Sequence, residues 1–426
     1  MPPRRPPDSW YEATANPAPD RPSLHGRHTA DVCVLGAGFA GLSAALELAD
    51  AGYRVIVLEA GHVGCGASGR NGGQALTGYG CSEDKIEKLL GPDDARLLFR
   101  WSLDGLRLIR ERIARYSIDC DWRDGQAHVA IKPRHVNELK AWQQHLAERY
   151  DYPLEWWDQA QLRTVLDSEH YIGALYDPGV GHLHTLNYLL GLASVATDKG
   201  AMIFEHSAVL KMDRGPRPIL YTAQGEVECE FVVLAGNVLV RGIAPELDRR
   251  IMPVATYIGA TPSLGAERAT RLIRNGMAVA DTNWALDYFR LSADHRLLFG
   301  GRASYSNLTP PNLRSVMTRR MTRVFPQLRG IGFDYLWGGV LDISMNRAPH
   351  WGRLERNVFF AQGFSGHGVA AAGLAGFILA EAIRGQAERL EVFERIRHHP
   401  FPGGRALRTP LLVAAMAWFK LRDALW

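Results

Sequence analysis

The stretch "TADVCVLGAGFAGLSAALELADAGYRVIVLEAG", residues 29–61, decides the fold. Residues 32–35 form a continuous apolar run, which is typical of a strand buried on both faces. A glycine-rich turn follows, and apolar residues then recur at helical spacing until Gly52. Residues 55–58 form a second apolar run that stops at Glu59. This order predicts a strand–helix–strand unit of a parallel sheet.

The turn between the first strand and the helix carries the pattern G-x-G-x-x-G at Gly36, Gly38 and Gly41. The first glycine permits the tight turn, the second lets the backbone approach a pyrophosphate, and the third lets the helix pack on the strand. The free N–H groups at the helix N-terminus favour phosphate. Glu59 can accept hydrogen bonds from a ribose diol, so the motif predicts a dinucleotide site.

Composition narrows the class of protein. The 426 residues are enough for two or three domains, and 49 basic against 45 acidic residues argue against nucleic-acid binding. Five irregularly spaced cysteines indicate neither a disulfide framework nor a metal site, which favours a reducing, cytoplasmic location. We expect no transmembrane helix and no signal peptide. The proline-rich residues 1–28 predict an extended arm without helix.

Beyond the motif, periodicity predicts helices at 83–116, 135–149 and 185–199. It predicts strands at 120–131, across "AMIFEHSAVL", and within "CEFVVLAGN" at 229–237. Alternating and aromatic residues between 254 and 335 predict an antiparallel sheet. The stretch "NVFFAQGFSGHGVAAAGLAGFILAEAI" predicts a strand, a glycine-rich turn and a helix of small residues.

The loop "GHVGCGASGRNGG", residues 61–73, follows the expected ribose-binding end of the second strand. Its glycines let backbone amides approach a bound cofactor. Arg70 and Asn71 carry spare hydrogen-bond donors, and the sequence leaves open whether they serve a phosphate, the cofactor ring or the substrate.

These segments together resemble the flavin-dependent D-amino-acid oxidase and glycine oxidase superfamily over residues 30–385. The resemblance is carried by the motif with Glu59, by "GASGRNGGQ", by "VVLAGN" and by "AQGFSGHGVAAAGLAG". "SWYEATANP" and "PFPGGRALRTPLL" are most similar to the γ-glutamylputrescine oxidase branch. The resemblance implies an α/β fold with a Rossmann-like FAD-binding domain and an α+β substrate domain built on a largely antiparallel sheet.

The resemblance also implies discontinuous domains. The FAD-binding domain is expected from 30–85, 150–250 and 335–390, and the substrate domain from 86–149 and 251–334. Residues 391–426 form a C-terminal extension.

The expected cofactor is FAD, held without a covalent bond, because the chain has no cysteine after Cys229 at the position where some sarcosine oxidase relatives attach it. Cys65 and His62 lie near the cofactor loop and are the other attachment candidates. Residues expected to bind FAD by this resemblance are Gly36, Ala37, Gly38, Phe39, Ala40, Gly41, Glu59, Ala60, Gly66, Ala67, Ser68, Arg70, Asn71, Gly72, Gly73, Gln74, Val209, Ala235, Gly236, Gly363, Phe364, Ser365, Gly366, His367 and Gly368.

The implied activity is oxidation of a CH–NH2 group. Hydride moves from the amine to the flavin, the resulting imine is hydrolysed to aldehyde and ammonia, and O2 or another acceptor takes the electrons. Candidate catalytic residues are His367, Asp342, Trp337 and Tyr288, and Trp284 and Tyr257 are weaker cavity candidates. No metal is expected.

The stretch "WGGVLDISMNRAPHWG", residues 337–352, argues for an amine substrate. In related glycine and D-amino-acid oxidases an arginine that clamps the substrate carboxylate stands where this chain has Leu341. Asp342 follows, and it is interpreted either as an attractant for an ammonium group or as a structural cap.

Two alternatives stay open. An oxidase of glycine, sarcosine or D-amino acids would need a clamp from Arg290, Arg302 or Arg347. A FAD dehydrogenase that passes electrons to a membrane quinone would use the basic, apolar tail, where residues 411–419 are too few to span a bilayer. That tail is interpreted as a packed helix or as a weak membrane-surface contact. The oligomeric state is not predicted.

Overall fold

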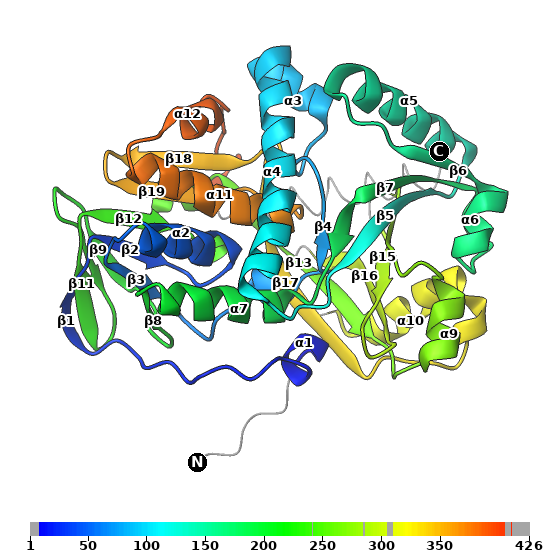
Figure 1. Ribbon diagram of the computed structural model, residues 1–426, viewed down its shortest axis with the longest axis horizontal. Coiled ribbons are helices and arrows are strands. Elements are labelled where there is room, and N and C mark those ends of the chain that lie inside the picture. The colour runs from blue at the N-terminus through cyan, green and yellow to red at the C-terminus, as the bar shows by residue number, and fades with distance from the viewer. Residues whose placement is uncertain (1–7, 241, 284–285, 305–309, 405–409, 411–426) are drawn as a thin grey trace.

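The computed structural model describes residues 8–240, 242–283, 286–304, 310–404 and 410. Two sheet-based halves lie side by side, and the long helix α4 (Pro92–Tyr116) runs between them (Figure 1). One half holds a parallel sheet with a small sheet on one face, and the other half holds a large, mostly antiparallel sheet. The predicted fold class is confirmed.

The parallel sheet has six strands in the order β18-β19-β12-β2-β3-β8. Only the edge strand β18 runs antiparallel to its neighbour. In the centre, Val34 pairs with Val57 on one side and with Val233 on the other. The strands are β2 (Val32–Leu35), β3 (Val55–Leu58), β8 (Met202–Phe204), β12 (Phe231–Leu234), β18 (His350–Glu355) and β19 (Val358–Gln362).

Apolar side chains on both faces of this sheet are covered, as the continuous apolar runs predicted. Val32 and Val34 face a layer made by α2 (Phe39–Asp50), α7 (Thr185–Asp198) and α11 (Gly368–Ile383). Cys33 and Leu35 face the small sheet. Its strands are β1 (Gly26–Thr29), β9 (Lys211–Asp213), β10 (Ile219–Tyr221) and β11 (Gly225–Glu228).

Small residues let α11 approach its neighbours. A Cβ on Gly376 would lie 2.1 Å from the carbonyl oxygen of Ala40 in α2, so only glycine fits there. Gly105 gives α4 a similar approach to α11. The small-residue composition of α11 therefore reflects close helix packing.

The large sheet has nine strands in the order β17-β13-β16-β15-β14-β5-β7-β4, with β6 paired to β7. Neighbours are antiparallel except for β14 and β5. The strands are β4 (Gln74–Ala75), β5 (Arg123–Ala130), β6 (Glu155–Asp158), β7 (Gly173–His182), β13 (Ile251–Ala260), β14 (Ala278–Asp281), β15 (Tyr288–Leu291), β16 (Leu297–Ser304) and β17 (Tyr335–Ser344). The remaining helices of this half are α5 (Pro133–Tyr150), α6 (Gln159–Val165), α9 (Ala266–Leu272) and α10 (Leu313–Val324).

The expected arm without helix is wrong for part of residues 1–28. Helix α1 (Trp10–Ala13) begins after Ser9, whose Oγ accepts a hydrogen bond of 3.2 Å from the Glu12 N–H. Trp10 and Tyr11 are buried, so tertiary packing stabilises a turn that is too short to form alone. Prolines lie before and after this turn but not within it.

Sheet membership differs from the predicted partition of the chain. Strands β6, β7 and β17 pair in the large sheet, although 150–250 and 335–390 were assigned to FAD binding. Helix α4, from the segment assigned to substrate binding, packs on α11. Strand periodicity reports burial but not which sheet a strand joins, so the sequence did not assign β6, β7 and β17 to the large sheet.

Other local predictions are confirmed or corrected in detail. Helices α3 (Glu83–Leu90), α4, α5 and α7 fall where periodicity placed them. Only β8 of "AMIFEHSAVL" is a strand, since His206 has φ of 52° and turns the chain. Helices α9 and α10 were not predicted within 254–335. The remaining short elements are α8 (Pro245–Asp248), α12 (Glu388–Glu394), and the 3₁₀ turns Ala67–Gly69, Asn237–Leu239 and Pro326–Leu328.

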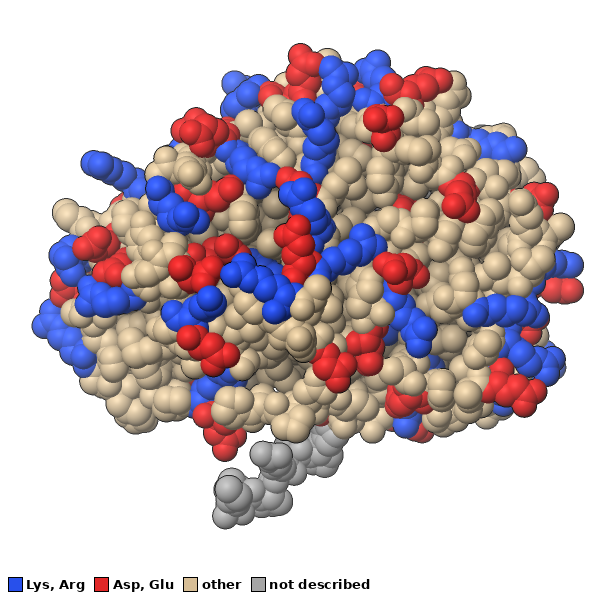
Figure 2. Space-filling model, viewed as in Figure 1, with Lys and Arg blue, Asp and Glu red and all other residues tan. Residues whose placement is uncertain are grey.

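In the part of the chain that the structure describes, no single helix has both the length and the apolar character to cross a membrane. Helices α11 and α12 reach both only when taken together, and they are bent by 118°. Residues 411–419 lie outside the described residues. On the face in Figure 2, acidic and basic side chains are interspersed. All five cysteines are unpaired.

Candidate active site

A cavity of about 1210 Å³ opens where the parallel sheet meets the large sheet. Its walls come from the glycine-rich turn before α2, the loop 64–74, the turn before α11, and the strands β5, β13, β14, β15 and β17. Four of the predicted site residues do not line it: Gly41, Gly73, Gly363 and Trp337. All the other predicted site residues do, so segments far apart in the sequence meet in one place.

Two of the three motif glycines, Gly36 and Gly41, are required by close backbone contacts. Gly36 has φ of 104°, and a Cβ there would lie 2.8 Å from the Ala235 carbonyl oxygen. A Cβ on Gly41 would lie 1.9 Å from the Gly36 carbonyl oxygen, which explains why this residue faces the sheet and not the cavity. Helix α2 begins after Gly38 without a side-chain cap. Ser68 Oγ accepts the Phe39 N–H of the first turn at 3.2 Å, so this helix N-terminus lies beside Ser68 in the cavity, where a pyrophosphate fits.

Glu59 lies at the carboxyl end of β3 and lines the cavity. Its Oε2 accepts the Ala37 N–H at 2.7 Å and its Oε1 accepts the Gly61 N–H at 2.9 Å. A carboxylate has about four acceptor positions, so capacity remains for a ribose hydroxyl. The Glu59 carboxylate can therefore hold the glycine-rich turn against β3 and bind a ribose diol at the same time.

Arg70 lines the cavity, but its guanidinium binds the protein. Its Nε donates to the Gly338 carbonyl oxygen at 2.8 Å, and its Nη1 lies 2.9 Å from Glu12 Oε1 of α1. The Trp337 indole N–H donates to the Arg70 carbonyl oxygen at 3.0 Å. These contacts argue against the interpretation in which this guanidinium binds phosphate, because its donors already tie the loop to α1 and β17.

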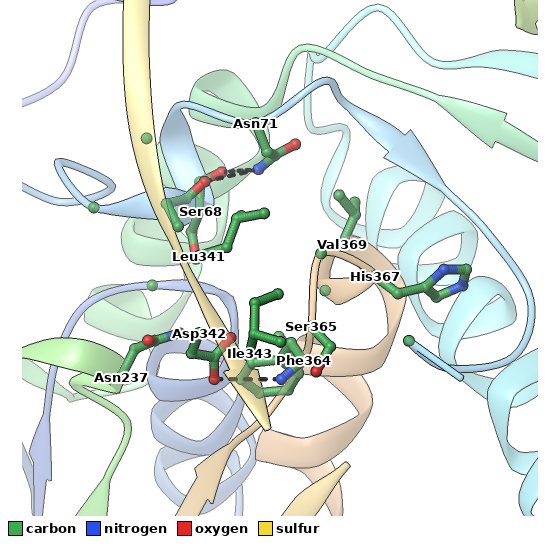
Figure 3. Close-up of a pocket in the computed structure, with 18 of the residues that line it drawn as sticks. Ser68, Asn71, Asn237, Leu341, Asp342, Ile343, Phe364, Ser365, His367 and Val369 are labelled. Carbon is green, nitrogen blue, oxygen red and sulfur yellow. Dashed lines mark hydrogen bonds between the residues drawn. The ribbon is translucent and has the colours of Figure 1, made fainter. Parts of the chain in front are cut away.

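Asn71 shapes the same loop from inside. Its Nδ2 donates to the carbonyl oxygens of Ala67 and Ser68, and its Oδ1 accepts the Gly73 N–H at 2.8 Å (Figure 3). The amide is thus used to hold the loop conformation. The glycine backbone, and not the Arg70 or Asn71 side chain, is what the loop offers to a cofactor.

A buried arginine fastens this loop from the other side. Arg290 of β15 is 2% exposed, and its Nε donates to the Gly72 carbonyl oxygen at 2.8 Å. Its Nη2 donates to the Tyr11 hydroxyl at 2.9 Å and to the Leu183 carbonyl oxygen at 3.0 Å. Arg290 therefore joins α1, the cofactor loop and the large sheet, and it is not available as a carboxylate clamp.

Asp342 lines the cavity, and its carboxylate is hydrogen-bonded to the turn before α11. Its Oδ2 accepts N–H groups from Gly363 and, at 3.3 Å, from Phe364, and its own carbonyl oxygen accepts the Ser365 N–H at 2.9 Å (Figure 3). Burial raises the pKa of Asp342 to about 6 despite these hydrogen bonds. The carboxylate thus caps the turn that precedes α11, as the structural-cap interpretation of Asp342 expected.

His367 is the residue before the first turn of α11 and lines the cavity. Its Nε2 lies 2.6 Å from the Thr77 carbonyl oxygen, which can only accept, so Nε2 carries the proton. Burial lowers the pKa of His367, and the ring is neutral near pH 7. In Figure 3 the ring points away from Asp342 and Phe364.

Of the two aromatic candidates for a catalytic role, Tyr288 lines the cavity and Trp337 does not. Tyr288 lines the cavity, and its ring lies against Gly72 and Gly300, where an added Cβ would come within 2.6 Å and 2.1 Å of it. Burial raises the pKa of the Tyr288 hydroxyl, which stays protonated. The prediction for Trp337 is wrong, because its ring packs with Trp10 and Tyr11 outside the cavity. Trp284 lies outside the described residues.

Leu341 lines the cavity. Of the other clamp candidates, the Arg302 side chain is outside the described part. Arg347 lines the cavity, and its Nη2 donates to the Ser365 carbonyl oxygen at 3.3 Å. Tyr257 packs in the apolar core of the large sheet.

The cofactor loop carries one thiol and one imidazole that were candidates for covalent attachment. Burial and the nearby Glu59 carboxylate raise the pKa of Cys65 to about 12, so its sulfur is a thiol near pH 7. His62 Nδ1 bonds Glu205 Oε2 at 2.8 Å, and His206 brings a third ligand-type atom within 4.8 Å of both. In the described structure His62 thus fastens the loop to the end of β8.

Sequence analysis missed three polar residues in the wall formed by the large sheet. Gln126 and His128 of β5 and Asp281 of β14 all line the cavity. They belong to no motif, and alternation along a strand was their only signal.

Comparison with known proteins gives a consistent result. The family model for FAD dependent oxidoreductases matches residues 31–382. The chain is 42% identical over 419 residues to gamma-glutamylputrescine oxidoreductase of Escherichia coli K12, covering 98% of each protein. It is 42% identical to a probable oxidoreductase of Haemophilus influenzae, covering 97% of each. Glycine oxidase from Geobacillus kaustophilus superposes with a TM-score of 0.72 at 21% identity, covering 84% of this chain and 95% of that one, and shows the same fold.

Proposed function

The chain belongs to the FAD-dependent oxidoreductase family, and we propose that it oxidises the primary amine of a γ-glutamylputrescine-like conjugate. The observation that carries the substrate class is Leu341, an apolar side chain where an amino-acid oxidase needs its clamping arginine. The relative that shares 42% identity over nearly the full length is named for this substrate.

The residues present fit FAD. A side chain at Gly36 or Gly41 would collide with a backbone oxygen, the N-cap Gly38 of α2 leaves room for a phosphate, and Glu59 stands at the expected ribose position. When bound there, FAD supplies two-electron oxidation of a carbon–nitrogen bond. We propose noncovalent binding, which the protonated Cys65 thiol supports.

The chain's own contribution is positioning and electrostatics. We propose that the N-terminus of α11 stabilises negative charge in the cavity, because Gly366, Gly368 and Val369 line it and no side chain caps the helix. Asp342 fixes the turn that aims this helix. Tyr288 and Leu341 form walls that exclude water, which favours an unprotonated amine.

We also propose a revised domain division and the remaining partners. The parallel sheet, the small sheet and the helices α2, α4, α7 and α11 form the FAD-binding domain, and the large sheet forms the substrate domain. O2 is the proposed electron acceptor. A reducing, cytoplasmic location is supported by the five unpaired thiols.

The proposed function is tested by adding substrates to the purified yellow protein without oxygen. We expect γ-glutamylputrescine, and more weakly putrescine, to bleach the visible absorbance of the flavin. Glycine, sarcosine and D-alanine should leave it unchanged. Bleaching by the three amino acids in preference to the amines would show that a carboxylate clamp exists and would favour the amino-acid oxidase alternative. Peroxide release after readmission of air tests O2 as acceptor.

Replacing Gly38 with valine is expected to abolish FAD retention. The new side chain would stand at the N-terminus of α2, beside Ser68, where the pyrophosphate has to approach. Each 1.4 kcal/mol of lost contact weakens binding about tenfold, and loss of two charge-assisted hydrogen bonds exceeds that. The measurement is the flavin-to-protein absorbance ratio after gel filtration. Gly373→Ala is the matched control, since open space surrounds that glycine. Equal flavin content in both variants would contradict the proposed phosphate site.

A further inference from the structure

One carboxylate in the cavity has no role in the proposed reaction. Asp281 is the last residue of β14 and lines the cavity with Ala280, Leu286 and Tyr288. Its residue is 5% exposed. The following inference rests on the proposed function and concerns the part of the substrate that is not oxidised.

The contacts of Asp281 leave its charge without a counterion. Its Oδ1 accepts the Asn283 N–H at 3.0 Å and its Oδ2 accepts the Asn283 Nδ2 group at 2.9 Å, and both donors are neutral amides. The described part of the chain places no lysine or arginine in ion-pair contact with it. Neighbouring Asp287 is different, because Arg320 Nε lies 2.6 Å from its Oδ1.

Asp281 therefore retains acceptor capacity for a further donor. A carboxylate offers about four acceptor positions, and the two amide contacts use half of them. Burial and the nearby Asp287 raise the pKa of Asp281 to about 7, as expected for a buried acid that lacks a cation. A cationic group in the cavity would stabilise its ionised form.

The position of Asp281 separates it from the reacting end. Leu341 is on β17 and Asp281 is on β14, and β13, β16 and β15 lie between them in the sheet. At about 4.8 Å for each strand interval, the two positions are up to about 19 Å apart along the sheet. The wall between them carries Thr256 of β13 and Tyr288 of β15, so a long chain with polar groups in its middle fits this space.

We propose that Asp281 binds a second ammonium group of the substrate, at the end opposite to the amine that is oxidised. In a γ-glutamylputrescine-like conjugate this group is the α-ammonium of the glutamyl part. The substrate class is then an elongated amine that carries a second cation, and a simple monoamine lacks the recognition element.

The test compares two substrates in two proteins. γ-Glutamylputrescine and glutarylputrescine have the same chain, but the second lacks the α-ammonium group. Flavin bleaching without oxygen gives the half-saturating concentration of each. We expect the unmodified protein to need about tenfold more of the glutaryl compound, the size of one charge-assisted hydrogen bond. In Asp281→Asn, the half-saturating concentration of γ-glutamylputrescine should rise about tenfold, whereas that of the glutaryl compound should stay unchanged.

Asp177→Asn is the matched control, because Asp177 is equally buried in the same sheet but bonds Tyr152 and does not line the cavity. Equal half-saturation of the two compounds in the unmodified protein would overturn the inference without any variant. Equal weakening of both in Asp281→Asn would show a structural role and would overturn it too. Bleaching by neither conjugate, in protein that dithionite bleaches normally, would instead refute the proposed function.

Discussion

Replacing Arg290 with methionine is expected to destabilise the protein by about 3–5 kcal/mol and to release the N-terminal helix. The guanidinium donates to the Gly72 and Leu183 carbonyl oxygens and to the Tyr11 hydroxyl. These acceptors stay buried when the donor is removed. The free energy of unfolding should therefore fall, since each unsatisfied acceptor is expected to cost about 1–3 kcal/mol.

The measurement is the thermal midpoint of the flavin-loaded protein, together with limited proteolysis of the segment around α1. Arg107→Met is the control, because the Arg107 side chain is 66% exposed and its surface ion pair with Asp104 is expected to contribute less than about 1 kcal/mol. An Arg290→Met protein that resists proteolysis and keeps its midpoint would show that α1 is held by apolar packing alone.

Acidification from about pH 7 to about pH 5 is expected to destabilise the fold strongly. Burial lowers the pKa from 6.5 to about 4 for His128 and His398, to about 3 for His182 and His184, and to about 2 for His350. The unfolded chain therefore binds more protons than the native chain below pH 6.5. Stability is full above pH 6.5 and is lost as the pH falls towards the native pKa values, by about 2 kcal/mol for each neutral histidine at pH 5.

Acids whose pKa is raised by burial act in the opposite direction. Asp281 and Asp342 have the largest shifts, and smaller ones in the same direction occur at Glu83, Asp121, Asp177, Asp287 and Glu381. The pKa values of Asp281, about 7, and Asp342, about 6, lie above the ordinary value of 3.8, so their protonation stabilises the fold as the pH falls. Together they offset about 4 kcal/mol at pH 5, which is less than the five histidines lose. Thermal midpoints measured from about pH 8 to about pH 5 should therefore fall, and a flat or rising curve would contradict the buried neutral histidines.

A substitution isolates one histidine in this titration. His184 precedes α7, and its Nδ1 accepts the Asn187 N–H at 3.1 Å. Asparagine is a favoured residue at this position, so His184→Asn keeps a cap and removes the titration. Its stability should depend less steeply on pH than that of the unmodified protein.

The features that sequence predicted best are those formed by neighbours in the chain. The first strand, the glycine turn, α2 and Glu59 depend on contacts within about one supersecondary unit, so periodicity and spacing report them. Asp342 shows the limit, because its partners Gly363 and Phe364 come from a different segment. Nothing near Asp342 in the sequence distinguishes a capping carboxylate from one that faces a ligand.

The sequence did not predict the contacts of Arg70 or the cavity position of Asp281, and the two reasons are related. The Arg70 donors are used by Glu12 and Gly338, one from the N-terminal segment and one from β17, and no local pattern connects them. Asp281 lines the cavity because β14 pairs with β5, which is about 150 residues earlier in the chain, and strand pairing is not encoded locally. The sequence therefore predicted the glycine-rich turn and Glu59 better than the cavity wall formed by the large sheet.

The order in which the segments of the proposed FAD site occur along the chain also affects how the protein folds during synthesis. Strand β2 leaves the ribosome early, but its neighbour β12 and the helix α11 that completes the site are made much later. Helix α1 is made first, but Arg290 and Trp337, which contact its Tyr11, are made much later. During synthesis the aromatic pair Trp10 and Tyr11 and the apolar strands stay uncovered, so chaperone protection and cofactor supply at the end of translation should govern the yield of active protein.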